Sequence, residues 1–217
     1  SFYRKARPLY VCLNYSRLRL SHLTRGWSRL WLFRENQIFQ QKLRTVQSKN
    51  DELWKKGWRL RILNTYVIHG QIRYTAVWVE STRDEIQVYG WKEKDFLSRN
   101  DELWEKGWRI SILQIYVVNG QVLYNAIWRH SERSERHVYN WKYKDFRRKH
   151  NELRREGWRL HLLQPYRIGT ELRCAAVWMY LPNRNERFIL NRKYAGYRVY
   201  HDRLFADGWR LHRLTVL

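Results

Sequence analysis

The chain lacks the residues and segments that mark several large classes of protein. Only two of its 217 residues are cysteines, Cys12 and Cys174, and their spacing matches no redox or metal-binding motif, so no disulfide framework is predicted. No apolar run approaches the length of a transmembrane helix. Arginines are scattered through the N-terminal residues, which excludes a signal peptide in the sequence as written. Because the sequence starts at Ser1, we expect a trimmed chain or a fragment, and the compartment stays open.

Catalytic motifs are also missing. The sequence contains no G-x-S-x-G nucleophile elbow, no S-x-x-K, no H-E-x-x-H and no phosphate-binding glycine loop. We interpret the eight histidines, including His150, as solvated or edge residues. The adjacent acids Asp51-Glu52 and Asp101-Glu102 have diverging directions, which favours solvation or pairing with a basic side chain over acid–base chemistry. We therefore predict no catalytic residue, no metal ligand and no cofactor, and a protein that is not an enzyme.

Acidic residues are in the minority. The chain has 43 Lys and Arg against 20 Asp and Glu, for a net charge of +23, and the cations occur in every part of it. Such a field attracts nucleic acid, acidic polysaccharide or an anionic membrane surface. The alternative is simply a heavily charged, soluble surface. An apolar fraction of 44%, with 13 Trp and 15 Tyr, is sufficient for a core and weighs against disorder.

What the sequence does have is a repeat. Asn100-Asp-Glu-Leu-Trp-Glu-Lys-Gly-Trp-Arg occurs almost unchanged from Asn50, more loosely from Asn151, and in a shortened form from Leu204. Landmark tryptophans therefore recur at intervals of 50, 50 and 51 residues, at Trp58, Trp108, Trp158 and Trp209. A fixed period near fifty indicates a repeat architecture.

Within one copy the pattern predicts a helix followed by a hairpin. Residues 92–106 have Phe96 and Leu103 on one face, with Asp95 in the first turn and Gly107 as a left-handed C-terminal cap. A strand with a period of two follows. Asn119-Gly120, the strongest short-range hairpin signal, leads to a returning strand that is apolar on both faces, as in Ile72 to Val79. The six tryptophans that recur in these strands are assigned to the core: Trp58, Trp78, Trp108, Trp128, Trp158 and Trp178.

The fold class that follows is α+β, made of tandem repeats of about 50 residues. Each repeat is a helix plus an antiparallel β-hairpin, and the repeats pack around a shared aromatic-rich core because one unit cannot bury its own apolar faces. The expected boundaries are 1–36 (an irregular N-terminal segment or degenerate leading repeat, with strands at 9–13 and 27–33 and a turn at 24–26), 37–86, 87–136, 137–187 and a partial repeat at 188–217. We hypothesise that the single strand of the partial repeat pairs with the N-terminal segment.

These residues resemble a known family. Residues 139–146, Asn151-Glu-Leu, Gly157-Trp-Arg-Leu160, Tyr166 and Ala175-Ala-Val-Trp178 are similar to the bacterial tandem repeat domain, and the match extends over roughly residues 37–217. Such repeats are found as non-catalytic regions beside serine-hydrolase domains, including the N-terminal part of polyglycine hydrolases. The resemblance implies an α+β repeat fold and an accessory or binding role, and it assigns no catalytic residue. The chain departs from the family in its basicity, its many tryptophans and its irregular first segment.

Two recurring features are candidates for a binding site. The first is the arginine after each landmark tryptophan, Arg59, Arg109, Arg159 and Arg210, which would form a basic row able to hold phosphate, sulfate or carboxylate. The alternative is pairing with Glu52, Glu102 or Glu152 on the preceding helix. The second is a set of aromatics that vary between copies and could stack on bases or sugars, or pack between repeats: Trp54, Trp104, Trp91, Trp141 and Tyr143. Cys174, in the place of Tyr74 and Tyr124, is interpreted as a small core residue.

The first function hypothesis is a non-catalytic repeat binding module whose basic and aromatic surface holds an anionic or carbohydrate polymer. The alternatives are an accessory domain of a secreted serine-type hydrolase, a nucleic-acid-binding protein without a recognised motif, and a purely structural scaffold. The expected partners are thus an acidic polysaccharide or nucleic acid, and a hydrolase domain or partner chain.

Overall fold

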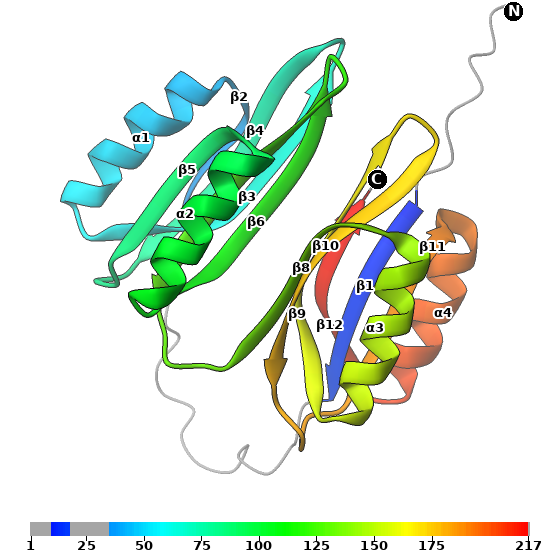
Figure 1. Ribbon diagram of the computed structural model, residues 1–217. Helices are drawn as coiled ribbons and strands as arrows, with labels where there is room; N and C mark the ends of the chain where they lie inside the picture. Colours follow the sequence, from blue (N-terminus) through cyan, green and yellow to red (C-terminus); the bar gives the residue numbers. More distant parts are fainter. Residues whose placement is uncertain (1–9, 18–34, 217) are drawn as a thin grey trace, which may run out of the picture. The chain divides into compact units, whose positions relative to one another are not determined.

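The computed structural model describes the backbone of residues 10–17 and 35–216, and the side chains of residues 35–187 and 196–209. The described residues form four three-stranded antiparallel sheets and four helices (Figure 1). The helices are α1 (Leu43–Lys55), α2 (Glu93–Glu105), α3 (Tyr143–Arg155) and α4 (Tyr194–Ala206). The strands are β1 (Tyr10–Arg17), β2 (Glu35–Gln41), β3 (Trp58–Ile68), β4 (Gln71–Glu80), β5 (Glu85–Lys92), β6 (Trp108–Val118), β7 (Gln121–His130), β8 (Glu135–Lys142), β9 (Trp158–Ile168), β10 (Glu171–Tyr180), β11 (Glu186–Lys193) and β12 (Trp209–Val216). None of the described helices is long and apolar enough to cross a membrane.

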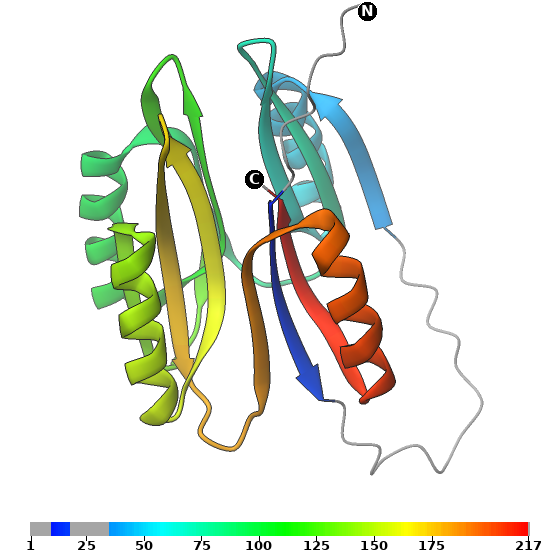
Figure 2. The same cartoon turned by 90° about the vertical axis from the view of Figure 1, so that its right-hand side faces the viewer.

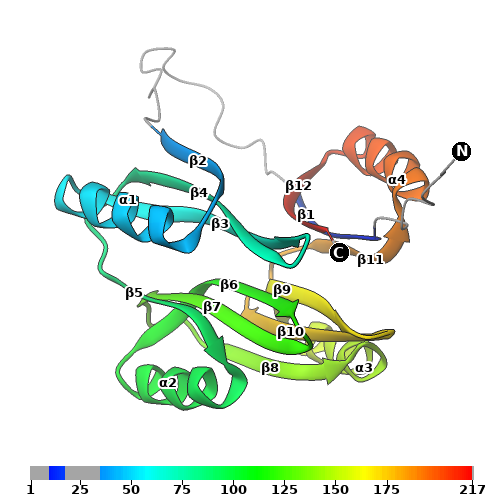
Figure 3. The ribbon, with the colours of Figure 1, turned by 90° about the horizontal axis from the view of Figure 1, so that it is seen from above.

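The elements separate into two compact units. One contains Arg29–Glu135 together with Tyr166–Arg173, and the other contains β1, Arg136–Pro165 and Cys174–Leu217. In the first unit, α1 and α2 each cover one face of their own sheet (Figure 3). The two sheets of this unit pack through β3 and β6, where Thr65 N donates to Gln114 Oε1 at 3.2 Å and Asn125 Nδ2 donates to Thr65 Oγ1 at 2.8 Å.

Each repeat has one strand more than the predicted helix and hairpin. The strand order is β2-β4-β3 in the first repeat, β5-β7-β6 in the second and β8-β10-β9 in the third, so a strand that precedes the helix pairs with the second strand of the hairpin. In β5 only Ile86 and Val88 follow the apolar alternation before the pairing with β7 shifts register between Val88 and Trp91. So short a pattern is a weak strand signal, which is why the sequence predicts only the hairpin.

The predicted helix and turn are confirmed. On α2, Phe96 and Leu103 are buried, Asp95 lies in the first turn, and Gly107 has a φ of +78° just beyond the helix. Asn119 and Gly120 have φ values of +51° and +76° between β6 and β7. Both values are positive, as a type I′ turn requires.

The core is built on the tryptophans of the central strands. Trp78, Trp128 and Trp178 are fully buried, whereas Trp58, Trp108 and Trp158 are partly exposed. Trp58 and Trp158 nevertheless pack against the core clusters of their repeats, so the expected core position is confirmed for five of the six. The partly exposed three stand at the first residue of their strands. The buried residues form separate clusters for the first, third and fourth repeats, with Ile112 and Ile127 of the second repeat joining the first. The expected shared core is thus confirmed in part, since one cluster is shared by the first two repeats.

Each buried indole donates to a side chain on its own helix. Trp78 Nε1 donates to Asn50 Oδ1 and Trp128 Nε1 to Asn100 Oδ1, both at 3.0 Å. In the third repeat Trp178 Nε1 donates to His150 Nδ1 at 3.2 Å. His150 is only 5% exposed, so its interpretation as a solvated or edge histidine is wrong. Cys174, as expected, is a buried residue of the core of the third repeat.

The fourth sheet is completed by the N-terminal segment. Its order is β11-β1-β12, so β1 lies between the two strands of the last repeat (Figure 2). Tyr15 pairs with Leu211 at the position where Trp78 pairs with Leu60, and both pairings are followed by a register shift at the equivalent residue. The hypothesis that the C-terminal strand pairs with the N-terminal segment is therefore confirmed. Both edges of β1 are occupied, so the N-terminal strand acts as a central strand and not as part of a leading hairpin. The expected strand at 27–33 and turn at 24–26 lie outside the described residues.

A proline in β1 is expected to unfold the last repeat. Leu13 pairs with both Ile189 and Leu214, and a proline at a central-strand position removes a ladder hydrogen bond and fits the sheet poorly, at a cost of about 3 kcal/mol. In hydrogen exchange of Leu13→Pro, residues 186–216 should lose protection while residues 35–130 keep it. Leu13→Val, which keeps the backbone donor, is the control. Equal protection of residues 186–216 in both variants would contradict the pairing.

Candidate binding surface

The arginines that follow the landmark tryptophans are held by main-chain carbonyls. Arg59 donates through Nη1 to Trp54 O and Trp58 O, at 3.3 and 2.9 Å, and through Nε to Arg83 O at 2.8 Å. Its guanidinium thus joins the last turn of α1, the start of β3 and the connector to β5. A cation at the C-terminus of a helix satisfies carbonyls that have no partner within the helix.

Arg109 and Arg159 repeat this arrangement. Arg109 Nη1 donates to Trp104 O and Trp108 O, both at 2.9 Å, and Arg159 Nη1 donates to Arg154 O and Trp158 O, at 2.9 and 2.8 Å. The side chain of Arg210 lies outside the described residues. The geometry gives the three described arginines a structural role in each repeat, in addition to whatever they present to a ligand.

Two of the predicted aromatics lie beneath these arginines. The guanidinium carbon of Arg59 is 3.4 Å from the centroid of the Trp54 ring, and that of Arg109 is 3.5 Å from the centroid of Trp104. Stacking of this kind is attractive because the face of the indole is electron-rich. The structure therefore brings these candidate residues together in pairs. In the third repeat Arg154 stands in place of the tryptophan.

The glutamates of the helices have other partners. Glu52 pairs with Lys49 and Lys56, at 2.8 and 2.7 Å, Glu102 with Arg99 and Lys106, and Glu152 with Lys149. Hydrogen bonds from Lys49 and Lys56 lower the pKa of Glu52 to about 2. The expected pairing of these acids with basic side chains is confirmed, but the arginines of the landmark row are not the partners.

The remaining aromatics differ in exposure. Trp91 and Tyr143 are half-buried, and Tyr143 lies 6.5 Å from Phe146 between ring centroids, against the core of the third repeat. Trp141 is 36% exposed and stands at the end of β8, two residues before α3. It is the member of the predicted set best placed to meet a ligand.

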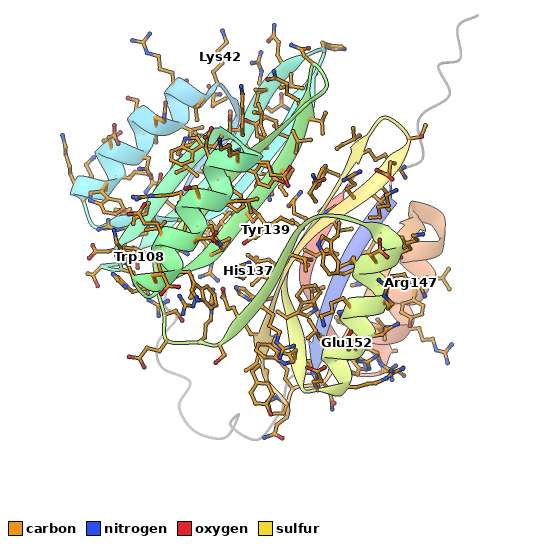
Figure 4. All side chains as sticks on the ribbon, viewed as in Figure 1. Lys42, Trp108, His137, Tyr139, Arg147 and Glu152 are labelled. Atoms are coloured by element: carbon orange, nitrogen blue, oxygen red, sulfur yellow. The ribbon has the colours of Figure 1, made fainter. Side chains whose placement is uncertain are left out.

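Among the equivalent helix segments of the first three repeats, that of α3 carries the largest net positive charge. Residues 42–56 at α1 follow, with five cations and two carboxylates, a net charge of +3. Residues 142–156 contain seven cations and three carboxylates, a net charge of +4 with His150 neutral, whereas the equivalent residues 92–106 contain four cations and five carboxylates, a net charge of −1. Figure 4 marks Arg147 and Glu152 along this helix. The exposed cations at and on α3 are Lys142, Lys144, Arg147, Arg148, Arg154 and Arg155, and we call them the α3 cations. Comparing the net charge of equivalent segments would have found them.

The acids near α3 neutralise little of this charge. Asp145 pairs with Arg148 at 3.3 Å and Glu156 with Arg136 at 3.3 Å. Arg147, Arg154 and Arg155 lie at spacings of seven and eight residues, so they share one side of the helix over about 10–12 Å. Within the described side chains, no group of His, Cys, Asp and Glu is arranged to hold a metal ion.

Replacing a landmark arginine is expected to destabilise its repeat. Arg109→Lys removes the guanidinium group, whose Nη1 donates to the carbonyls of Trp104 and Trp108 and whose Nε donates to the carbonyl of Arg133. The substitution also loses the stacking on the Trp104 ring. We expect a decrease of about 2 kcal/mol in the free energy of unfolding, measured by urea denaturation. Arg99→Lys, on the exposed face of α2, is the matched control and should change stability by less than about 0.5 kcal/mol. Equal stabilities of the two variants would show that the carbonyl contacts of Arg109 matter little.

Comparison with protein families supports the resemblance seen in the sequence. The model of the polyglycine hydrolase-like structural repeat matches three successive segments, residues 38–81, 87–131 and 139–180. These segments coincide with the first three helix-and-sheet repeats, and together they cover more than half of the chain. No curated protein and no solved structure matches the chain. The chain therefore belongs to the polyglycine hydrolase-like structural repeat family.

Proposed function

We propose that this chain is a non-catalytic binding module that holds an acidic polysaccharide on the α3 cations. The observation that carries the proposal is the uneven charge of equivalent helices: α3 and its flanks are strongly basic, although the same fold is built with a slightly acidic α2. A basic α3 is thus not needed for the repeat to fold. Sulfate and carboxylate groups are natural ligands of arginine because the guanidinium fork matches their oxygens.

Trp141 extends this surface with an aromatic ring. An exposed indole next to Lys142 in the chain supports binding of a sugar ring by stacking while the cations hold its acidic groups. Nucleic acid would be attracted by the same charge. The polysaccharide is preferred because the predicted aromatics are mostly stacked within the fold, which leaves few rings for a series of bases.

The family points to a compatible context. Its description as a structural repeat of polyglycine hydrolase-like proteins supports an accessory role beside a hydrolase, and a polymer-binding module is one form that such a role takes. Sequencing the coding region on both sides of these residues tests the accessory role separately, because an adjoining hydrolase domain would supply the partner.

The binding proposal is tested by fluorescence anisotropy with three labelled probes: a heparin oligosaccharide, single-stranded DNA of similar charge, and a neutral oligosaccharide. We expect the heparin probe to bind most tightly, with an affinity that falls steeply as salt rises. Tighter binding of DNA would favour a nucleic-acid function. No binding of either anion at low salt would leave a structural scaffold.

A further inference from the structure

The junction between successive repeats is built on a buried glutamate. The first strand of the second, third and fourth repeats begins with Glu85, Glu135 and Glu186, and each of these residues is less than 10% exposed. Glu85 Oε1 accepts a hydrogen bond from Leu60 N at 3.2 Å, and Glu186 Oε2 accepts one from Leu160 N at 3.1 Å. The carboxylate thereby joins a strand of one repeat to the hairpin of the repeat before it.

At two junctions an arginine of the chain completes the arrangement. Arg129 donates through Nε and Nη2 to Glu85 Oε2, at 3.1 and 2.6 Å, and through Nη2 also to Leu60 O. Arg133 donates through Nε to Glu135 Oε1 and through Nη2 to Ile110 O at 2.7 Å. The two arginines come from different positions, a strand and a connector, yet each guanidinium bridges the glutamate and the carbonyl of the corresponding residue. At both junctions the group that pairs with the buried glutamate is therefore a guanidinium.

Glu186 differs from the other two. It is 5% exposed, and among the described residues no donor reaches its Oε1 atom. Burial raises the pKa of this carboxyl, against the effect of the hydrogen bond from Leu160 and of nearby arginines. Leaving a buried carboxylate oxygen without a donor is costly.

The same glutamate lines an open pocket of about 390 Å³. The other residues that line it are Arg154, Asn185, Arg187, Asp207 and Trp209. Trp209 is 7% exposed and forms an apolar wall, with the guanidinium carbon of Arg187 5.4 Å from its ring centroid. The pocket thus offers two carboxylates, Glu186 and Asp207, beside an aromatic surface. Its two arginines balance those carboxylates, so the lining has no net charge to repel a cation.

We propose that this pocket binds the guanidinium group of an arginine side chain presented by a partner polypeptide. The group would donate to Glu186 Oε1, in the manner of Arg129 at Glu85 and Arg133 at Glu135. A guanidinium fits because it is planar, weakly hydrated and able to stack against Trp209 while its N–H groups reach both carboxylates. This ligand is cationic, whereas the α3 cations attract an anion. The two sites share Arg154, so the two proposals are distinguished by the charge of the probe that binds.

The test is an NMR titration of the full chain with N-acetyl-L-arginine amide. We expect saturable shifts of the Leu160 amide and the Trp209 indole, with affinity in about the millimolar range for so small a probe. Glu186→Gln keeps an acceptor for Leu160 N but removes the charge, and should weaken binding about tenfold. N-acetyl-L-lysine amide, which lacks the fork, should bind more weakly than the arginine probe.

A second variant tests the site without relying on Glu186→Gln. Ser16 pairs with Glu186 in the register in which Arg129 pairs with Glu85. In Ser16→Arg, the new guanidinium group should therefore fill the pocket and pair with Glu186. The variant should have a higher melting temperature and should not bind the arginine probe. The proposal is overturned if the probe gives no saturable shift, if Glu186→Gln and the unmodified chain bind it equally, or if inorganic phosphate shifts the same signals at lower concentration.

Discussion

Replacing Arg147, Arg148, Arg154 and Arg155 with glutamine is expected to weaken heparin binding by about ten- to a hundredfold at low salt, since each lost ionic contact also lowers the salt dependence by roughly one counterion. These side chains are exposed, and the Arg148–Asp145 pair that the variant loses contributes little to stability. The fold should therefore persist, with an unchanged far-ultraviolet circular dichroism spectrum. The affinity is measured by anisotropy with the labelled oligosaccharide.

The repeat supplies a matched control for this variant. Changing Lys92, Lys94, Arg99 and Lys106 to glutamine removes four positive charges from α2 and its flanking residues, the same number that the first variant removes from α3. If binding depends on the α3 cations, this variant should lose less than about threefold in affinity through the weaker long-range field. Equal losses in the two variants would show that only the total charge matters.

Lowering the pH from about 6.5 to 4 should destabilise the third repeat through His150. Burial, aided by Arg154 and Arg159, lowers the pKa of His150 to about 4 from an ordinary value of 6.5. The unfolded chain then binds the proton more readily than the folded one, so the stability present above pH 6.5 is lost as the pH falls toward 4. The difference between the two pKa values corresponds to about 3 kcal/mol. Protonation also removes the Nδ1 acceptor of the Trp178 indole.

His150→Asn isolates this effect. The substitution installs the residue that accepts the indole hydrogen bond in the first two repeats, Asn50 and Asn100. Carboxylates that titrate in the same range contribute equally to both proteins, so they cancel in the difference. Urea unfolding from pH 7 to 4 should show the unmodified chain losing about 3 kcal/mol more than the variant. Parallel pH profiles would mean that His150 is protonated in the folded state without penalty.

The helix, its C-terminal cap and the hairpin turn could be predicted from the sequence because each depends on residues that are close together in the chain. The conformations of Gly107 and Asn119-Gly120 were predicted correctly because few residue types other than glycine and asparagine adopt a left-handed backbone conformation readily. The helix was predicted because Phe96 and Leu103 recur at the helical period. The strand β5 was missed, since its pairing depends on a partner some 40 residues away and its own apolar pattern is short.

The candidate site was predicted less well, for a physical reason. Arg59 and Arg109 were chosen as candidate binding residues because they recur at the fifty-residue period. In the structure both guanidinium groups donate hydrogen bonds to main-chain carbonyls of their own repeat. A residue that recurs in every copy often serves the feature that every copy shares, which is the fold. The α3 cations are instead a feature in which the third copy differs from the second. Glu85, Glu135 and Glu186 also recur, but the arginine partners of Glu85 and Glu135 lie in another strand and in a connector, and sequence alone does not place them.

Residue-specific footprinting of lysines on the unmodified chain tests the binding account most directly. Acetylation with and without bound heparin, followed by mass spectrometry, reports the accessibility of Lys142 and Lys144 at α3 and of Lys92, Lys94 and Lys106 at α2. If the α3 cations hold the polymer, heparin protects Lys142 and Lys144 and leaves the three α2 lysines as reactive as before. Protection spread evenly over both helices, or confined to α2, would contradict the binding account.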